Sequence, residues 1–113
     1  MTVIETPGFI RDASAAMTDE ERIEMIAFLA ANPEAGDIMA ERGGGRKLRW
    51  KAQGRGKSGG VRVIYYFHNE SLPLFLLNVF AKNEKANLTS AERNAMKALL
   101  PRLVAGYRKR MTL

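Results

Sequence analysis

The chain of 113 residues contains no cysteine and a single histidine, His68. Without cysteine it forms no disulfide and no thiolate metal site, and one histidine does not supply the ligand cluster of a zinc site. It also lacks an apolar run of membrane-spanning length, and its first residues lack the basic-then-apolar order of a signal peptide. We therefore expect one cytoplasmic domain over residues 1–113, with no metal, no cofactor and no membrane association.

A further absence is local, because no acidic residue occurs between Arg42 and Arg62. The basic residues there are Arg42, Arg46, Lys47, Arg49, Lys51, Arg55, Lys57 and Arg62. By contrast, residues 1–41 hold nine acidic and two basic residues, whereas 42–113 hold sixteen basic and three acidic. A solvated edge strand is one explanation, since lysine at a sheet edge prevents aggregation. Uncompensated like charges repel one another, so we favour a surface that binds a polyanion such as a phosphate backbone.

The basic segment has the pattern of a β-hairpin. Leu48 and Trp50 alternate with basic residues, which gives one apolar and one cationic face. A Gly/Ser-rich loop leads to a second run over 61–66, where Arg62 and Tyr66 share a face. The exposed backbone N–H groups of such a loop, together with arginine and lysine, suit phosphate oxygens.

Helical and strand segments flank the hairpin in a definite order. The predicted elements are a strand over 2–6, a short helix over 9–17, a helix from Thr18 to Asn32, a further helical turn over 37–41, the hairpin, an apolar strand over 72–80 and a helix over 90–109. Thr18 and Thr89 each begin a capping box, which supports both longer helices. Pro101 is expected to kink or break the last one. This order predicts an α+β fold with a small antiparallel (meander) sheet, two N-terminal helical segments and a C-terminal helix.

The run Gly54–Tyr66 (Gly-Arg-Gly-Lys-Ser-Gly-Gly-x-Arg-x-x-Tyr-Tyr), followed by an apolar strand and Lys-Asn-Glu-Lys at 82–85, resembles the RelE/HigB branch of bacterial type II toxin–antitoxin toxins. The resemblance extends over nearly the whole chain and implies a RelE-like fold. It also implies a metal-independent endoribonuclease that cleaves mRNA on the ribosome and is neutralised by a cognate antitoxin. In that reaction the 2′-hydroxyl attacks the adjacent phosphate and leaves a 2′,3′-cyclic end. The chemistry needs a base, cations around the phosphate and an acid for the leaving oxygen.

The resemblance also assigns roles to individual residues. Arg62 matches the arginine that clamps the phosphate. Arg49 stands in place of a lysine used as a base by some members, and an always-protonated guanidinium suits an electrostatic role instead. Lys57 is a candidate replacement for that base. Lys82 or Lys85 is a candidate for a catalytic arginine that strict register places on Asn83. The predicted RNA contacts are Arg46, Lys47, Lys51, Arg55, Tyr66 and Lys85.

Other features leave alternatives open. No aromatic residue occurs over 86–92, where some relatives place a base-stacking tyrosine. His68 is interpreted as a turn or surface residue rather than a catalytic one, and Tyr65 as a core residue. A toxin of the same fold that acts on DNA gyrase is one alternative function, although the density of basic residues argues against it. A non-enzymatic RNA- or ribosome-binding module is another, because no obvious acid and base are present.

Overall fold

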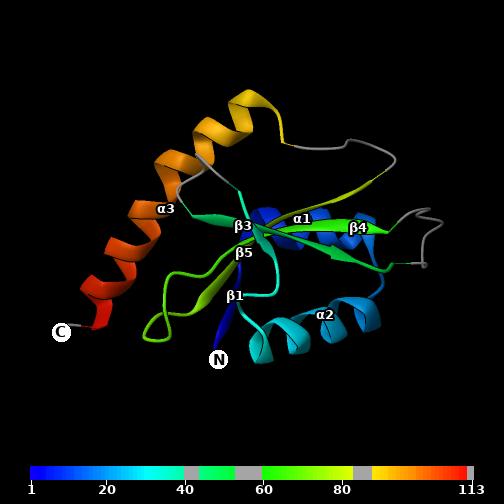
Figure 1. Ribbon diagram of the computed structural model, residues 1–113, viewed down its shortest axis with the longest axis horizontal. Coiled ribbons are helices and arrows are strands. Elements are labelled where there is room, and N and C mark those ends of the chain that lie inside the picture. Colours follow the sequence, from blue (N-terminus) through cyan, green and yellow to red (C-terminus); the bar gives the residue numbers. More distant parts are fainter. Residues whose placement is uncertain (40–43, 53–59, 83–87, 112–113) are drawn as a thin grey trace.

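The computed structural model describes residues 1–39, 44–52, 60–82 and 88–111 (Figure 1). The elements in chain order are β1 (Val3–Glu5), α1 (Pro7–Ala16), α2 (Asp19–Ala31), β2 (Asp37–Ile38), β3 (Gly45–Trp50), β4 (Val61–Tyr66), β5 (Leu74–Ala81) and α3 (Ser90–Met111). The strands form one sheet in the order β1-β5-β4-β3-β2. This arrangement confirms the predicted α+β class, with strands β3, β4 and β5 as the antiparallel meander.

The two ends of the sheet differ from the prediction. β1 lies at the edge as expected, but it runs parallel to β5, so the sheet is mixed rather than wholly antiparallel. The helical turn predicted over 37–41 is wrong for Asp37 and Ile38, which form β2 opposite Lys47 and Arg46, and residues 40–41 lie outside the described part. The pairing of this short segment with β3 is a tertiary effect that local helix propensity does not capture.

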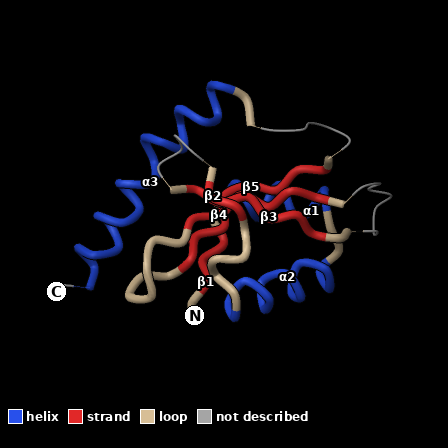
Figure 2. Tube along the Cα trace, in the orientation of Figure 1, coloured by secondary structure: helices blue, strands red, loops and turns tan. Residues whose placement is uncertain are grey.

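The sheet has a hydrophobic layer on each face, and helices cover the two faces separately (Figure 2). α1 and α2 cover one face, where the core comprises Phe9, Ala13, Ala16, Met17, Met25, Leu29, Leu48, Ala52, Val61, Val63, Tyr65, Leu74, Leu76 and Val79. α3 packs on the other face, with Met39, Ile64, Tyr66, Leu72, Phe75, Leu77, Phe80, Leu88, Met96, Leu100 and Val104. β5 is therefore apolar on both sides, as its hydrophobic run, interrupted only by Asn78, predicts.

Capping residues fix where the helices begin. Thr18 accepts from the backbone N–H of Glu21, whose carboxylate accepts from the Thr18 N–H, so the predicted capping box is confirmed. The same exchange joins Thr89 and Glu92 at the start of α3. α3 continues past Pro101 to Met111, so Pro101 does not break the helix, and the alternative of a kink stays a prediction. Within the described residues, no helix has the length and apolar character needed to cross a membrane.

The junction between β1 and α1 shapes one edge of the molecule. Thr6 caps α1 by accepting from the Phe9 N–H, and its hydroxyl donates to the Leu76 carbonyl at 2.8 Å. Pro7 occupies the first turn of the helix, where a missing N–H costs nothing, and it turns the chain away from the sheet. β5 continues beyond the last residue paired with β1, and there the Asp12 carboxylate accepts from the Val79 N–H.

Candidate active site

The cationic face predicted for the hairpin is present on the side of the sheet that carries α3. Arg49 of β3 lies directly opposite Arg62 of β4, and Lys47 lies opposite Ile64. Because side chains alternate along a strand, Lys47, Arg49 and Arg62 project from one face, which they share with Ile64. The predicted division of β4 into two faces is thereby confirmed, since Val61, Val63 and Tyr65 belong to the opposite core.

Arg62 is the unusual member of this set, because its side chain is buried with an exposed fraction of 8%. Its register neighbours are Arg49 on one side and Phe80 on the other. Within the described residues, its guanidinium donates one hydrogen bond, to the Val61 carbonyl at 3.3 Å, and forms no ion pair with a carboxylate. A buried guanidinium normally has an acidic partner. Within the described residues, most of its donors therefore have no protein partner and suit an anion.

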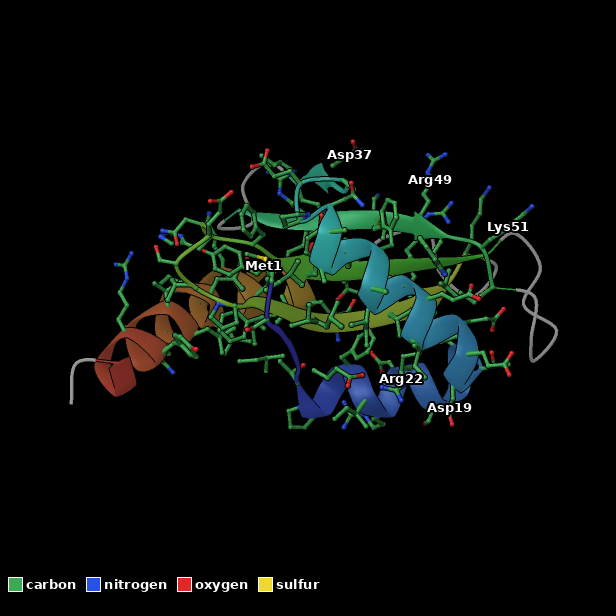
Figure 3. All side chains as sticks on the ribbon, turned by 90° about the horizontal axis from the view of Figure 1, so that it is seen from below. Met1, Asp19, Arg22, Asp37, Arg49 and Lys51 are labelled. Atoms are coloured by element: carbon green, nitrogen blue, oxygen red, sulfur yellow. The ribbon has the colours of Figure 1, made fainter. Side chains whose placement is uncertain are left out.

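Further cations gather at the same end of the sheet. The N–H of Lys82 donates to the Gly60 carbonyl at 3.2 Å, so the end of β5 lies beside the start of β4. Lys82 is exposed, as is Lys51, which follows β3 directly. Figure 3 shows the Arg49 and Lys51 side chains projecting outward into open space. The face therefore combines a buried arginine with exposed cations around it, and this positive charge is of the kind that attracts a polyanion.

Arg46 does not belong to the cationic face. It alternates with Lys47 and lies opposite Tyr65, on the side of α1 and α2. Its guanidinium donates to the carbonyls of Glu34 and Gly36, at 3.1 and 2.8 Å. The side chain therefore holds the segment before β2 in place, and the structure gives it a structural role where the sequence suggested an RNA contact.

Tyr66 shares the face of Arg62 but its ring is buried, with an exposed fraction of 7%. It packs in the core beneath α3, and burial raises its pKa, an effect that the charge of Arg108 opposes. A ring in this position offers no open surface for base stacking. Three other predicted site residues, Arg55, Lys57 and Lys85, lie outside the described residues.

A hydrogen-bonded group that the sequence analysis missed lies at the other end of β4. The Tyr66 hydroxyl and His68 Nδ1 are 2.9 Å apart, and Arg108 Nη2 lies 3.3 Å from His68 Nε2. Because a guanidinium only donates, Nε2 accepts and Nδ1 carries the proton toward the Tyr66 oxygen. His68 is exposed, as predicted, and it joins α3 to the sheet. No sequence signal links residues 40 positions apart.

The chemistry available on the cationic face is electrostatic. Lysine and arginine supply positive charge and hydrogen-bond donors for phosphate oxygens, both in the ground state and in a pentavalent transition state. Among the described residues, no group of three or more His, Cys, Asp and Glu side chains is placed to hold a metal ion. The described part of the face thus fits a site that binds and polarises a phosphodiester.

A comparison with protein families matches this architecture. Residues 1–112 match the family model described as the RelE toxin of the RelE/RelB toxin–antitoxin system. The match covers essentially the whole chain, and the mixed sheet with its three helices is consistent with a RelE-like fold. The chain therefore belongs to the RelE toxin family, and its family membership implies an antitoxin as its partner.

Proposed function

We propose that this toxin is a metal-independent endoribonuclease that cleaves mRNA on the translating ribosome. The observation that carries the proposal is Arg62, a buried guanidinium that faces Arg49 across two strands and has no carboxylate partner among the described residues. Like charges directly opposite one another destabilise a sheet. A phosphate bound between them would remove that repulsion and satisfy the buried donors.

The proposed reaction is attack of a ribose 2′-hydroxyl on the adjacent phosphate. The bond from the 2′-oxygen to phosphorus forms, the bond to the 5′-oxygen breaks, and the products are a 2′,3′-cyclic phosphate and a 5′-hydroxyl. Arg62 and Arg49 stabilise the added negative charge of the transition state. Lys57 is proposed to take the 2′ proton, and Lys82 to return a proton to the leaving 5′ oxygen. Lys47 and Lys51 hold the flanking phosphates, together with Arg55 and Lys85.

The test is to express the toxin inducibly and to map mRNA 5′ ends by primer extension. Wild type is compared with Arg62→Ala and with Arg22→Ala, which removes an arginine from the opposite side of the sheet. We expect new ends inside translated frames in wild type and in Arg22→Ala, and a loss of roughly 10²–10³-fold in Arg62→Ala. Growth arrest without any new ends would contradict the proposal, and ends in untranslated RNA would contradict the coupling to the ribosome.

A second candidate is a non-enzymatic RNA- or ribosome-binding protein, favoured because the charged side chains that β3 and β4 place on the described face, Lys47, Arg49 and Arg62, are all cations. The two candidates differ in how Arg62→Ala divides its effect. A binding protein loses affinity by about one phosphate contact, which lowers the salt slope by about one. A nuclease loses far more in turnover than in affinity, so single-turnover cleavage and filter binding on the same RNA separate them.

A further inference from the structure

The cationic face of β3 and β4 continues onto the edge strand β2, where it meets a carboxylate. Asp37 lies directly opposite Lys47, so its side chain is on the face that carries Lys47, Arg49 and Arg62. Among the described residues of β2 to β5, Asp37 is the only acidic one, and it is exposed. Figure 3 shows Asp37 and Arg49 projecting outward at the same edge of the sheet. An RNA strand on this face therefore meets one group that repels phosphate.

Buried neighbours on both sides hold Asp37 in place. The N–H of the buried Gly36 donates to the Tyr65 hydroxyl at 2.8 Å, and its carbonyl accepts from the Arg46 guanidinium at 2.8 Å. A β-carbon at Gly36 would lie 2.7 Å from the Tyr65 ring, so the backbone packs directly on that ring. On the other side, Met39 is buried and its N–H donates to the first residue of β3 at 2.8 Å. This anchoring gives an exposed side chain the fixed position that recognition requires.

A structural ion pair does not account for this carboxylate. Within the described part of the chain, no ion pair includes Asp37, although Lys47 lies directly opposite it. An exposed pair between two such side chains would also contribute little to stability. The carboxylate oxygens are therefore positioned to accept hydrogen bonds from a ligand, and the donors that an RNA strand offers are the N–H groups of its bases and its ribose hydroxyls.

The distance from Arg62 decides between these two kinds of donor. Strands are about 4.8 Å apart and residues about 3.4 Å apart along a strand, so the backbone of Asp37, two strands and two residues away, lies about 12 Å from that of Arg62. A group that takes the 2′ proton has to lie about 3 Å from the 2′ oxygen, which is itself about 3–3.5 Å from the phosphorus. The short side chain of Asp37 is too distant for that task. Its position suits a base instead, because base and phosphate are at opposite ends of a nucleotide.

We propose that Asp37 sets the base preference of the cleavage site by accepting hydrogen bonds from the Watson–Crick edge of a guanine. Guanine alone presents two adjacent donors on that edge, the ring N1–H and the N2 amino group, and they match the two oxygens of a carboxylate. Adenine, cytosine and uracil each place an acceptor beside their donor, and that acceptor would face a carboxylate oxygen. This role rests on the proposed cleavage at Arg62, and it adds a nucleotide preference to that same site.

The experiment has two readouts, the base composition at mapped cut sites and the affinity of the purified toxin for short oligonucleotides. The oligonucleotides are runs of uracil with one guanine, adenine or cytosine, made with 2′-deoxyribose so that they cannot be cleaved. Wild type should bind the guanine form about 10–100-fold more tightly than the adenine form and should cut beside guanine. In Asp37→Asn the amide offers one donor and one acceptor, so the preference should move to adenine or cytosine. Glu34→Gln, which removes the same charge from an exposed side chain of the preceding turn, should behave like wild type.

The two readouts separate a failure of this role from a failure of the nuclease. Cleavage by wild type without a guanine preference in either readout would overturn the role of Asp37 and leave the nuclease standing. An equal loss of cleavage at all sequences in Asp37→Asn, with unchanged base composition at the cut sites, would overturn it in favour of a part in the chemical step. A guanine preference in binding that Asp37→Asn removes, without any cleavage by wild type, would uphold the role and refute the nuclease.

Discussion

Replacement of Arg62 by methionine should stabilise the free protein while it removes the proposed activity. The side chain is 8% exposed and has one hydrogen bond of 3.3 Å and no carboxylate partner within the described residues. Relief of its desolvation, less the loss of that bond, is worth about 1–3 kcal/mol. Relief of repulsion from Arg49, directly opposite, adds up to about 1 kcal/mol. Methionine keeps an apolar stem of similar length beside Phe80.

The assay is urea unfolding at pH 7, with and without inorganic phosphate. We expect the free energy of unfolding of Arg62→Met to exceed that of wild type by about 1–4 kcal/mol. Phosphate at ten times its dissociation constant should stabilise wild type by about 1.4 kcal/mol and should have a smaller effect on Arg62→Met.

Arg46→Met provides the matched control, because Arg46 donates to two carbonyls on the opposite face. It should lower the free energy of unfolding by about 1–3 kcal/mol. A fall in stability for Arg62→Met, comparable with that for Arg46→Met, would refute the reasoning, because it would mean that the Arg62 guanidinium stabilises the fold. If phosphate raised the free energy of unfolding equally in both variants and in wild type, the anion would bind away from Arg62.

Two further substitutions test contacts in and beside β4, the strand that holds Arg62. Tyr65→Phe should lower the free energy of unfolding by about 1–3 kcal/mol in urea, because it leaves the Gly36 N–H and the Pro33 carbonyl, each 2.8 Å from the hydroxyl, without a partner. Burial raises the pKa of Tyr65 above 10.0, so the stability that the neutral hydroxyl contributes is complete below pH 10 and is lost as the pH rises further. The free energy of unfolding should therefore fall less between neutral and high pH in Tyr65→Phe than in wild type. Gly60→Ala should lower stability by about 1–3 kcal/mol and reduce RNA cleavage, since Gly60 has φ +75° and a β-carbon would lie 2.5 Å from the Trp50 carbonyl oxygen. Wild-type stability in Gly60→Ala would show that the turn adapts.

Local patterns predicted most of the elements of this fold. The capping boxes at Thr18 and Thr89 are reciprocal hydrogen bonds between residues three apart, so the sequence contains both partners. The alternation along β4 placed Arg62 and Tyr65 on opposite faces, because the period of two is a property of the strand itself. The cationic face followed from the same periodicity.

The remaining features depend on contacts between distant segments. Nothing near Asp37 indicates that it pairs with Lys47, and nothing near Arg46 indicates that carbonyls of Glu34 and Gly36 accept from it. Pro101 removes one helical hydrogen bond, but it is exposed. Core contacts on both sides of it, through Leu100 and Val104, keep α3 continuous.

The apolar groove between α3 and the start of α1 also escaped prediction for a physical reason. Leu99 recurs with other apolar residues of α3 at helical spacing, yet it lines this groove and has an exposed fraction of 43%. Its exposure depends on where β1 ends and where Pro7 turns the chain, more than 90 positions earlier in the sequence. Amphipathic periodicity gives the direction of a face but not what covers it.

The parallel pairing of β1 with β5 has a consequence for the timing of folding. Thr6 bonds to Leu76, 70 positions along the chain, so the edge of the sheet closes a long loop. Such closure has a large entropic cost and slows folding. During synthesis, β1 cannot form its strand pair until β5 has left the ribosome. Phe80, which lies directly opposite Arg62, is also part of β5. The cationic face that contains Arg62 is therefore completed only after β5 has been synthesised.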